Sequence, residues 1–252
     1  MDSTNNVRRD GDIHPNGKLI WVAAANGGKG NWRKLDKEEF IERKLSEFPF
    51  LRFTIDDFTL KNPKRDIALN GVFHDPSGYA VATDRNVLIY DKEFYDQYFS
   101  GKIIAKHKIV REDGVDIEVG QRIFGTYPAW RPIVNSVQNG AVIKRVNLLD
   151  LMFFLVKTYE FLYNQCHKNI KSLNSLVERT SIELELPDGR KVPMSLEIFR
   201  KLVSAAYVMQ LSDFYFSTSS YMVMFQNEFR GVLAVHQVHT HEIVCEYSLK
   251  NN

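Results

Sequence analysis

Two segments of the chain place apolar side chains at helical spacing behind a good capping residue. The first begins at Asp36, whose carboxylate can cap the free amides while Glu39 completes a variant capping box, and Pro49 ends it. The second begins after Ser195 and repeats apolar residues on one face as far as Ala206. We therefore predict helices over 36–48 and 195–207.

A third helical segment is apolar around most of its circumference. Asn147 can cap it, and its polar residues trace one narrow face while Leu, Met, Phe and Val occupy nearly every other position. Because such a helix must be buried on most sides, we expect Phe153 or Leu155 in the core. The polar face is made by Asp150, Lys157, Glu160, Asn164, Lys168 and Lys171.

The remaining regular pattern is that of strands joined by turns. Asp75-Pro76-Ser77-Gly78, Glu112-Asp113-Gly114 and Pro187-Asp188-Gly189 are turn sequences between strand-like segments. We expect a short helix over 91–100 and a linker over 126–135, which contains two prolines. The predicted strands are 19–25, 67–73, 79–83, 86–90, 103–110, 115–119, 181–186, 190–194, 213–217, 221–226 and 231–238.

Helices and hairpins thus alternate twice along the chain, which predicts an α+β protein. We expect two similar domains, each with two helices packed on hairpin-rich antiparallel sheets. Residues 1–30 are predicted to form a polar arm and a short strand, residues 31–135 the first domain and residues 136–252 the second. The similarity is one of architecture, since the two halves do not match residue by residue.

The composition and the length of the apolar runs indicate the class and the cellular location of the protein. The chain has 252 residues, of which 44% are hydrophobic and 25% charged, so a disordered or collagen-like chain is excluded. The longest apolar run, Leu151 to Val156, is far shorter than the roughly 18–20 residues of a membrane span. Residues 1–18 lack the apolar core of a signal peptide, and Cys166 and Cys245 fit reduced thiols. We expect a cytoplasmic protein without membrane contact.

Motifs for catalysis are weak. Asn26 to Gly30 lacks both the first glycine and the hydroxyl residue of a phosphate-binding loop, so a flexible turn is favoured. Asp84 ends an apolar strand, where an aspartate more often bonds its own backbone in a turn than acts in catalysis. No nucleophile motif is present. We expect no enzyme and no cofactor.

Four potential metal ligands crowd into ten residues near the C-terminus: His236, His239, His241 and Cys245. On a strand, His239 and His241 face one side and His236 the other. His167 beside Cys166 is the only candidate for a second cluster. A strand with incidental histidines is favoured, and a metal-dependent enzyme stays as the less favoured alternative.

Three segments carry a resemblance to a known family. Arg65 to Val72 and Val81 to Leu88 are similar to consecutive strands of the middle domain of the bacterial DNA polymerase III beta subunit, the sliding clamp. Tyr127 to Val134 resembles the aromatic-Pro-x-aromatic-Arg segment that leads into the last clamp domain. The order of the later helices, hairpin and closing strand also resembles that family. The chain departs from the pattern at Arg85, where the family has glycine, and at Ala234-Val235, where the family has Met-Pro.

The resemblance implies a DNA-clamp-like fold and a non-enzymatic processivity factor in DNA replication. Such clamps close as rings around duplex DNA with helices lining the hole, and a two-domain chain would need about three copies, so a homo-oligomer is expected. Carried over residue by residue, the positions of the pocket for polymerase-type peptides are Thr83, Leu88, Val232 and Ala234.

A ring that holds DNA topologically needs only a weak basic lining without sequence preference. Lys+Arg exceed Asp+Glu by 33 − 31 = 2, so any DNA contact must be local. The candidates for such a lining are Lys and Arg side chains on the predicted helices, and the alternative for them is a solvated helix face without DNA contact. The alternative for the whole protein is a clamp-fold interaction module without ring closure. The candidate DNA-facing residues are Lys37, Arg43, Lys44, Lys157, Lys168, Lys171, Arg200 and Lys201.

Overall fold

The computed structural model describes residues 19–22, 31–61, 66–112, 115–139, 141–217, 222–234 and 242–249. The chain divides into two compact units, Met1–Pro49 and Phe50–Asn252. The boundary expected at 135/136 does not coincide with this division.

The first unit contains one helix and a two-stranded ribbon. Strand β1 (Leu19–Val22) pairs antiparallel with β2 (Asn31–Lys34), and α1 spans Lys37–Glu47. The Asp36 carboxylate accepts a hydrogen bond from the Glu39 amide at 2.9 Å, and the Glu39 carboxylate accepts one from the Asp36 amide at 3.1 Å. The predicted capping box and helix are confirmed.

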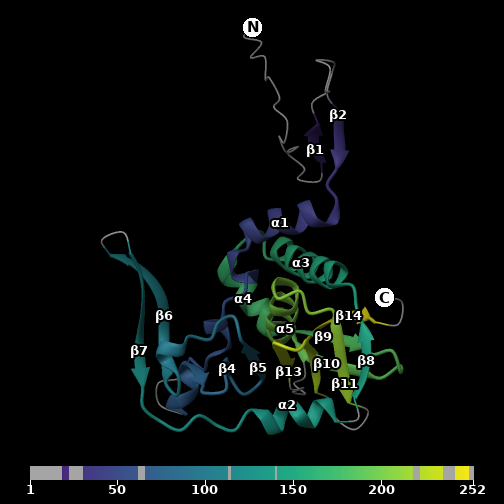
Figure 1. The fold of residues 1–252 in the computed structure, drawn as a ribbon. Coiled ribbons are helices and arrows are strands. Elements are labelled where there is room, and N and C mark those ends of the chain that lie inside the picture. Colours follow the sequence, from purple (N-terminus) through teal and green to yellow (C-terminus); the bar gives the residue numbers. More distant parts are fainter. Residues whose placement is uncertain are drawn as a thin grey trace. The chain divides into compact units, whose positions relative to one another are not determined.

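The second unit is organised around a nine-stranded antiparallel sheet in the order β7-β6-β3-β4-β5-β13-β12-β11-β8 (Figure 1). The first half of the chain contributes five consecutive strands and the second half four, and β5 pairs with β13 where the two sets meet. The strands are β3 (Val72–Asp75), β4 (Tyr79–Thr83), β5 (Val87–Asp91), β6 (Ile103–Glu112), β7 (Val115–Ile123), β8 (Ala141–Arg145), β11 (Asp213–Ser217), β12 (Val223–Gln226) and β13 (Arg230–Ala234).

The central strands of this sheet are buried on both faces. On one face, Leu88 and Leu233 form a core cluster with Trp130, Val134 and other residues of the segment that contains α2 (Arg131–Gln138). Neighbouring strand residues alternate between faces, so Ile89 and its partner Val232 point to the opposite side, where α5 (Leu196–Val208) contacts β5, β12 and β13. Double-sided burial explains why these strands are apolar at nearly every position.

The other helices and a small sheet complete this unit. Helix α3 (Leu148–Gln165) packs on α5, and Leu155 is fully buried as expected. The predicted hairpin is confirmed as β9 (Thr180–Glu185) and β10 (Lys191–Ser195), which form a three-stranded sheet with β14 (Ile243–Ser248). Asn147 and Ser195 cap α3 and α5 as predicted.

The apolar helix predicted from Asn147 is interrupted before Lys171. Residues His167 and Lys168 have φ of +49° and +62°, and the Asn169 side chain accepts hydrogen bonds from the first amides of a separate helix, α4 (Ile170–Glu178). The spacing of polar residues alone does not predict this break. Lys168 therefore lies in the turn and Lys171 at the start of α4.

Three further predictions of local structure are wrong or hold only in part. Ile67–Asn70 is a 3-10 helix, so the strand begins only at Val72. Within 91–100 only Gln97–Phe99 is helical. The expected linker 126–135 instead leads into α2, whose Pro132 sits in the first turn, where its missing N–H costs no helical hydrogen bond.

The mixed α+β class is confirmed. Within residues 31–135, α1 belongs to the first unit, and α2 begins at Arg131 and continues past residue 135. Across the described ranges, no helix is long and apolar enough to cross a membrane.

Side chains reinforce the sheet where β5, β13 and β12 lie side by side. The Tyr90 hydroxyl donates to Gln226 Oε1 at 2.8 Å, a contact between residues 136 positions apart. A Cβ at Gly231 would lie 2.5 Å from the same hydroxyl, so this position has no room for a side chain. Asp91 is 1% exposed, and its Oδ2 lies 3.6 Å from Arg230 Nε.

Asp91 makes stability depend on pH. Burial raises the pKa of this carboxyl from 3.8 to about 6, and Arg230 opposes the shift only in part. The folded state therefore favours the protonated acid, and stability is lost as pH rises from about 4 through about 6. We expect Asp91→Asn to gain about 1–3 kcal/mol relative to wild type between pH 4 and pH 7.5, measured by urea unfolding.

The control for this measurement is Glu178→Gln at the exposed end of α4. Its pH profile should follow wild type. Parallel profiles for Asp91→Asn and wild type would contradict the assignment.

Candidate functional site

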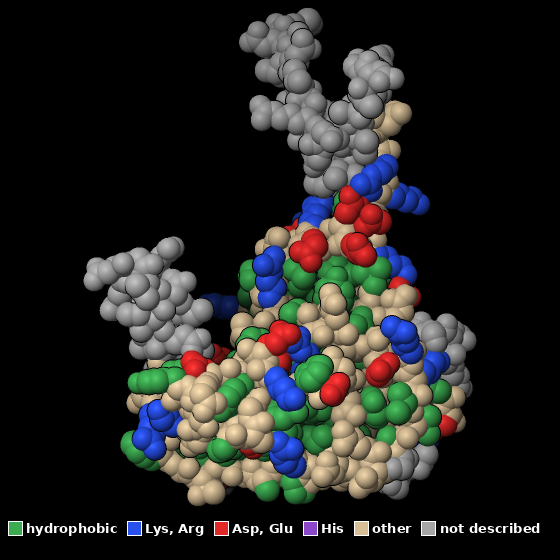
Figure 2. Space-filling model, in the orientation of Figure 1, with side chains coloured by type: hydrophobic (Ala, Val, Ile, Leu, Met, Phe, Trp, Pro, Cys, Tyr) green, Lys and Arg blue, Asp and Glu red, His purple; other side chains and the backbone are tan. Residues whose placement is uncertain are grey.

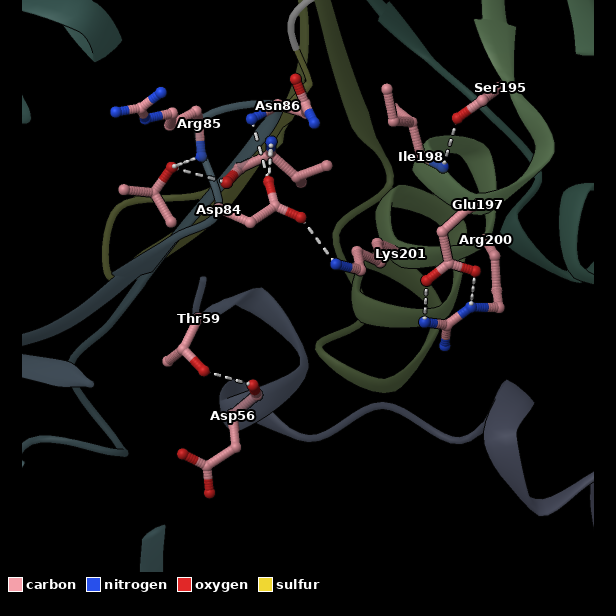
Figure 3. A network of polar contacts seen from close by, with 12 residues as sticks. Asp56, Thr59, Asp84, Arg85, Asn86, Ser195, Glu197, Ile198, Arg200 and Lys201 are labelled. Atoms are coloured by element: carbon pink, nitrogen blue, oxygen red, sulfur yellow. Dashed lines mark hydrogen bonds and ion pairs between the residues drawn. The ribbon is translucent and has the colours of Figure 1, made fainter. Parts of the chain in front are cut away.

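The turn between β4 and β5 is a small hydrogen-bonded unit (Figure 3). Asp84 Oδ1 accepts hydrogen bonds from the amides of Asn86 and Val87, both at 2.9 Å. The Thr83 hydroxyl donates to the Val87 carbonyl at 2.8 Å and accepts from the Arg85 amide at 3.0 Å. Asp84 is thus the turn residue that the sequence predicted, bonding its own backbone.

Arg85 occupies a backbone conformation that favours glycine. Its φ is +81°, and its amide donates a hydrogen bond to the Thr83 hydroxyl within the turn. For a residue with a side chain this region costs about 1–2 kcal/mol. The Arg85 guanidinium forms an ion pair with Asp66, whose own φ is +47°. Exposed pairs of this kind contribute only about 0–1 kcal/mol, so the pair does not offset the strain.

Helix α5 is tied to this turn by a mostly buried ion pair. Lys201 Nζ lies 2.6 Å from Asp84 Oδ2, with the two side chains 12% and 15% exposed (Figure 3). One residue earlier, Arg200 donates two hydrogen bonds to the Glu197 carboxylate and one to the Phe50 carbonyl. These contacts hold the turn and helix in one arrangement.

A cavity of about 740 Å³ opens beside the Thr83–Val87 turn. Its lining comes from residues 66–69, from the turn and Leu88, from residues 124–133 and from Leu233 of β13. We call it the turn cavity. Four separate parts of the chain therefore meet around one hollow.

The turn cavity is predominantly apolar. Leu69, Leu88 and Leu233 are buried, and Leu88 and Leu233 are direct partners across the β5–β13 pair. Ile67 and Phe124 also line it but are exposed, at 56% and 77%. Large apolar side chains left exposed around a concave apolar surface are typical of a binding site.

Few charges border the turn cavity. Asp66 and Arg85 line it and pair with each other. The Arg122 guanidinium lies over the ring of Phe124, 4.9 Å from its centroid. Among the described residues, two guanidinium groups and one carboxylate thus lie at or beside the lining.

Two of the four positions expected for a peptide pocket line this cavity. Thr83 and Leu88 do, whereas Val232 and Ala234 are buried and alternate with Leu233, which takes their place. The β13 residue that lines the cavity, Leu233, is thus one position away from each of the two expected residues, because successive side chains of a strand point to opposite faces. Leu69 and Ile133 also line the cavity, and both lie inside the segments that resemble the clamp family.

The eight candidate DNA-facing residues are divided between the two units. Lys37, Arg43 and Lys44 belong to α1 in the first unit, where Arg43 and Lys44 both pair with Glu47. In the second unit Lys157 pairs with Glu160 at 2.8 Å.

Arg200 and Lys201 form ion pairs with Glu197 and Asp84, so a phosphate contact would first have to break these pairs. Lys168 and Lys171 are exposed. On the face drawn in Figure 2, the described Lys and Arg side chains are scattered among acidic and apolar ones without a continuous stripe.

The histidine cluster considered for metal binding lies outside the described residues at His236, His239 and His241. Within the described ranges no group of three or more His, Cys, Asp or Glu side chains is placed to hold a metal ion. The glycine-rich turn at 26–30 also lies outside them.

Comparison of the chain with protein-family models, with curated proteins and with solved structures finds no match. The residues of the turn cavity must therefore carry the functional interpretation themselves.

The Asp84–Lys201 pair should stabilise the site. Lys201→Ala leaves the mostly buried Asp84 carboxylate without its cation. We therefore expect the free energy of unfolding, measured in urea, to fall by about 1–3 kcal/mol. The more exposed Lys157–Glu160 ion pair gives a matched control, since Lys157→Ala should lower the free energy of unfolding by less than about 1 kcal/mol. Equal losses from the two variants would contradict the structural importance of the buried pair.

Proposed function

We propose that this protein is a sliding-clamp-like processivity factor without enzymatic activity, and that a short apolar peptide of a partner protein docks in the turn cavity. One observation supports this most directly. The three segments that resemble the clamp family, 65–72, 81–88 and 127–134, all contribute to the lining of this cavity.

That convergence matters because the third segment lies far from the other two in the chain. Segments 65–72 and 81–88 contribute to the neighbouring strands β3, β4 and β5, so their proximity is expected. Chance similarity gives no reason for segment 127–134 to border the same apolar hollow. The strand expected to close the last clamp domain supplies Leu233 to the same hollow. A shared peptide site is the simplest reason for the similarity to fall at these positions.

The chemistry of the turn cavity fits a peptide with apolar anchors. Its volume lies within the range of about 300–1,000 Å³ common for ligand sites. Leu69, Leu88, Leu233 and Ile133 present no hydrogen-bonding side-chain groups, so affinity would come from burying apolar side chains. Leucine and phenylalanine side chains supply the most apolar area per residue for this purpose.

The proposed contact with DNA is weak and without sequence preference. A ring that surrounds duplex DNA needs little affinity, which suits a chain of net charge +2. Lys168 and Lys171 are the exposed candidates in the second unit. Because a two-domain chain would need about three copies for a ring, the proposal includes a homo-oligomer.

A clamp-fold interaction module without ring closure is the second candidate. It is favoured by Arg200 and Lys201, whose side chains are mostly buried and already paired with Glu197 and Asp84, which removes two cations from any DNA-facing surface. It shares the peptide site with the first candidate and differs from it only in DNA binding and assembly.

Peptide docking can be tested with a neutral probe, acetyl-Gly-Ser-Asn-Leu-Phe-amide, by calorimetry or NMR titration. We expect binding with Kd between micromolar and millimolar, and a loss of about tenfold, or 1.4 kcal/mol, in Phe124→Ala. The matched control is Tyr98→Ala, an equally exposed aromatic that does not line the cavity. No binding to wild type, or equal losses in both variants, would contradict docking in the turn cavity.

DNA binding separates the two candidates. For a clamp, the logarithm of the affinity for duplex DNA should fall steeply with the logarithm of salt concentration, and Lys171→Ala should reduce that slope by about one. Lys191→Ala is the control, since that ammonium group already contacts Glu183 and Glu246.

A clamp should also show a native mass of three or more copies and remain on circular DNA until the circle is cut. A monomer whose weak DNA binding ignores salt would overturn the clamp proposal and favour the interaction module.

A further inference from the structure

The residue that distinguishes the turn cavity from the family pattern is Arg85. The sequence has arginine where the resembling clamps have glycine, and the turn holds this residue at φ +81°, a conformation that glycine would adopt without cost. The weak ion pair with Asp66 does not compensate for that strain. Backbone strain kept at a residue that lines a cavity points to a use for its side chain.

The Arg85 guanidinium is available to a ligand. Its side chain is 55% exposed, and it lines the same hollow as Leu88 and Leu233. It already forms an ion pair with Asp66. Because a guanidinium has five N–H donors, a second carboxylate can bind beside the first or replace it. Because the pair with Asp66 is exposed, exchanging one carboxylate for another costs little.

Among the described residues at or beside the lining of the turn cavity, positive charges outnumber negative ones. Arg85 and Arg122 carry two positive charges, and Asp66 supplies one negative charge. The other carboxylate of the turn, Asp84, is occupied by two backbone amides and by Lys201. A ligand with a single carboxylate would bring these described side chains to two cations and two anions.

We infer that Arg85 is a specificity-determining residue which selects, for the turn cavity, a peptide that carries a carboxylate next to its apolar side chains. The inference rests on the proposed docking of a peptide in this cavity. The apolar side chains would lie against Leu88 and Leu233, and the carboxylate would bind the Arg85 guanidinium at the edge.

The test compares peptides that differ only in one carboxylate. Acetyl-Gly-Ser-Asp-Leu-Phe-amide is titrated against its isosteric Asn counterpart, together with two further pairs in which the Asp or Asn lies one or two residues farther from Leu-Phe. Unlabelled peptides and calorimetry keep dye charges out of the comparison. In at least one pair we expect wild type to prefer Asp by about five- to tenfold in low salt, with the preference shrinking in high salt.

Two variants of Arg85 keep the test independent of folding. Arg85→Gln retains a polar side chain, and Arg85→Gly relieves the strained backbone, so its urea midpoint should equal or exceed that of wild type. Both should bind the Asp and Asn peptides equally. The matched control is Arg190→Gln, which removes another turn arginine paired with an aspartate, Asp188, outside the cavity, and should keep the preference.

The outcomes are distinguishable. Equal binding of Asp and Asn peptides to wild type in all pairs, or an Asp preference that survives both Arg85 variants, would overturn the selectivity while leaving peptide docking intact. If no peptide of either kind binds wild type, the proposed function fails, and the inference about Arg85 fails with it.

Discussion

The pairing of β5 with β13 is the contact on which the second compact unit depends. It joins strands from the two halves of the chain into one sheet, and the sheet is covered on both sides at this pair. Helix α5 covers one side and the segment containing α2 covers the other. Since both faces are buried, neither strand can shift by one residue without moving an entire apolar row to the wrong side. Gly231 and the Tyr90–Gln226 hydrogen bond fix the register further.

The turn cavity is a consequence of that pairing. Leu88 and Leu233 are partners across the pair, and the Thr83–Val87 turn lies at the start of β5, next to Leu88. The Asp84–Lys201 ion pair then ties the turn to α5 on the far side of the sheet. An apolar hollow is thus bordered by a rigid turn, which is a favourable way to present a charged side chain such as Arg85 to a ligand.

Basic residues serve different purposes in this molecule, and their type alone does not distinguish them. Arg200 and Lys201 lie in consecutive positions of a helix that could line a DNA-facing surface, yet both are used for internal ion pairs. Lys171 is exposed, and Arg85 borders the turn cavity. The proposed clamp function must therefore rest on fewer cations than the eight basic residues suggest, whereas the proposed peptide site gains one that the resembling family lacks.

Local interactions were predictable from the sequence by itself. The capping box at Asp36, the caps at Asn147 and Ser195, the Asp84 turn, and the hairpins after Pro76 and Pro187 all depend on contacts within a few residues, so the residue types and spacing suffice. The α+β class followed from them. The resemblance also pointed to Thr83 and Leu88, because its motif covers both.

Only the tertiary structure decided the rest. The break between α3 and α4, the pairing of β5 with β13 and the partners of Arg200 and Lys201 depend on residues distant in the chain or on which of two similar local states packs better. The assignment of Leu233 rather than Val232 or Ala234 to the turn cavity has the same origin. A strand's sequence shows that its side chains alternate, but which set faces the cavity is determined by the neighbouring strand and by the layers packed above and below it.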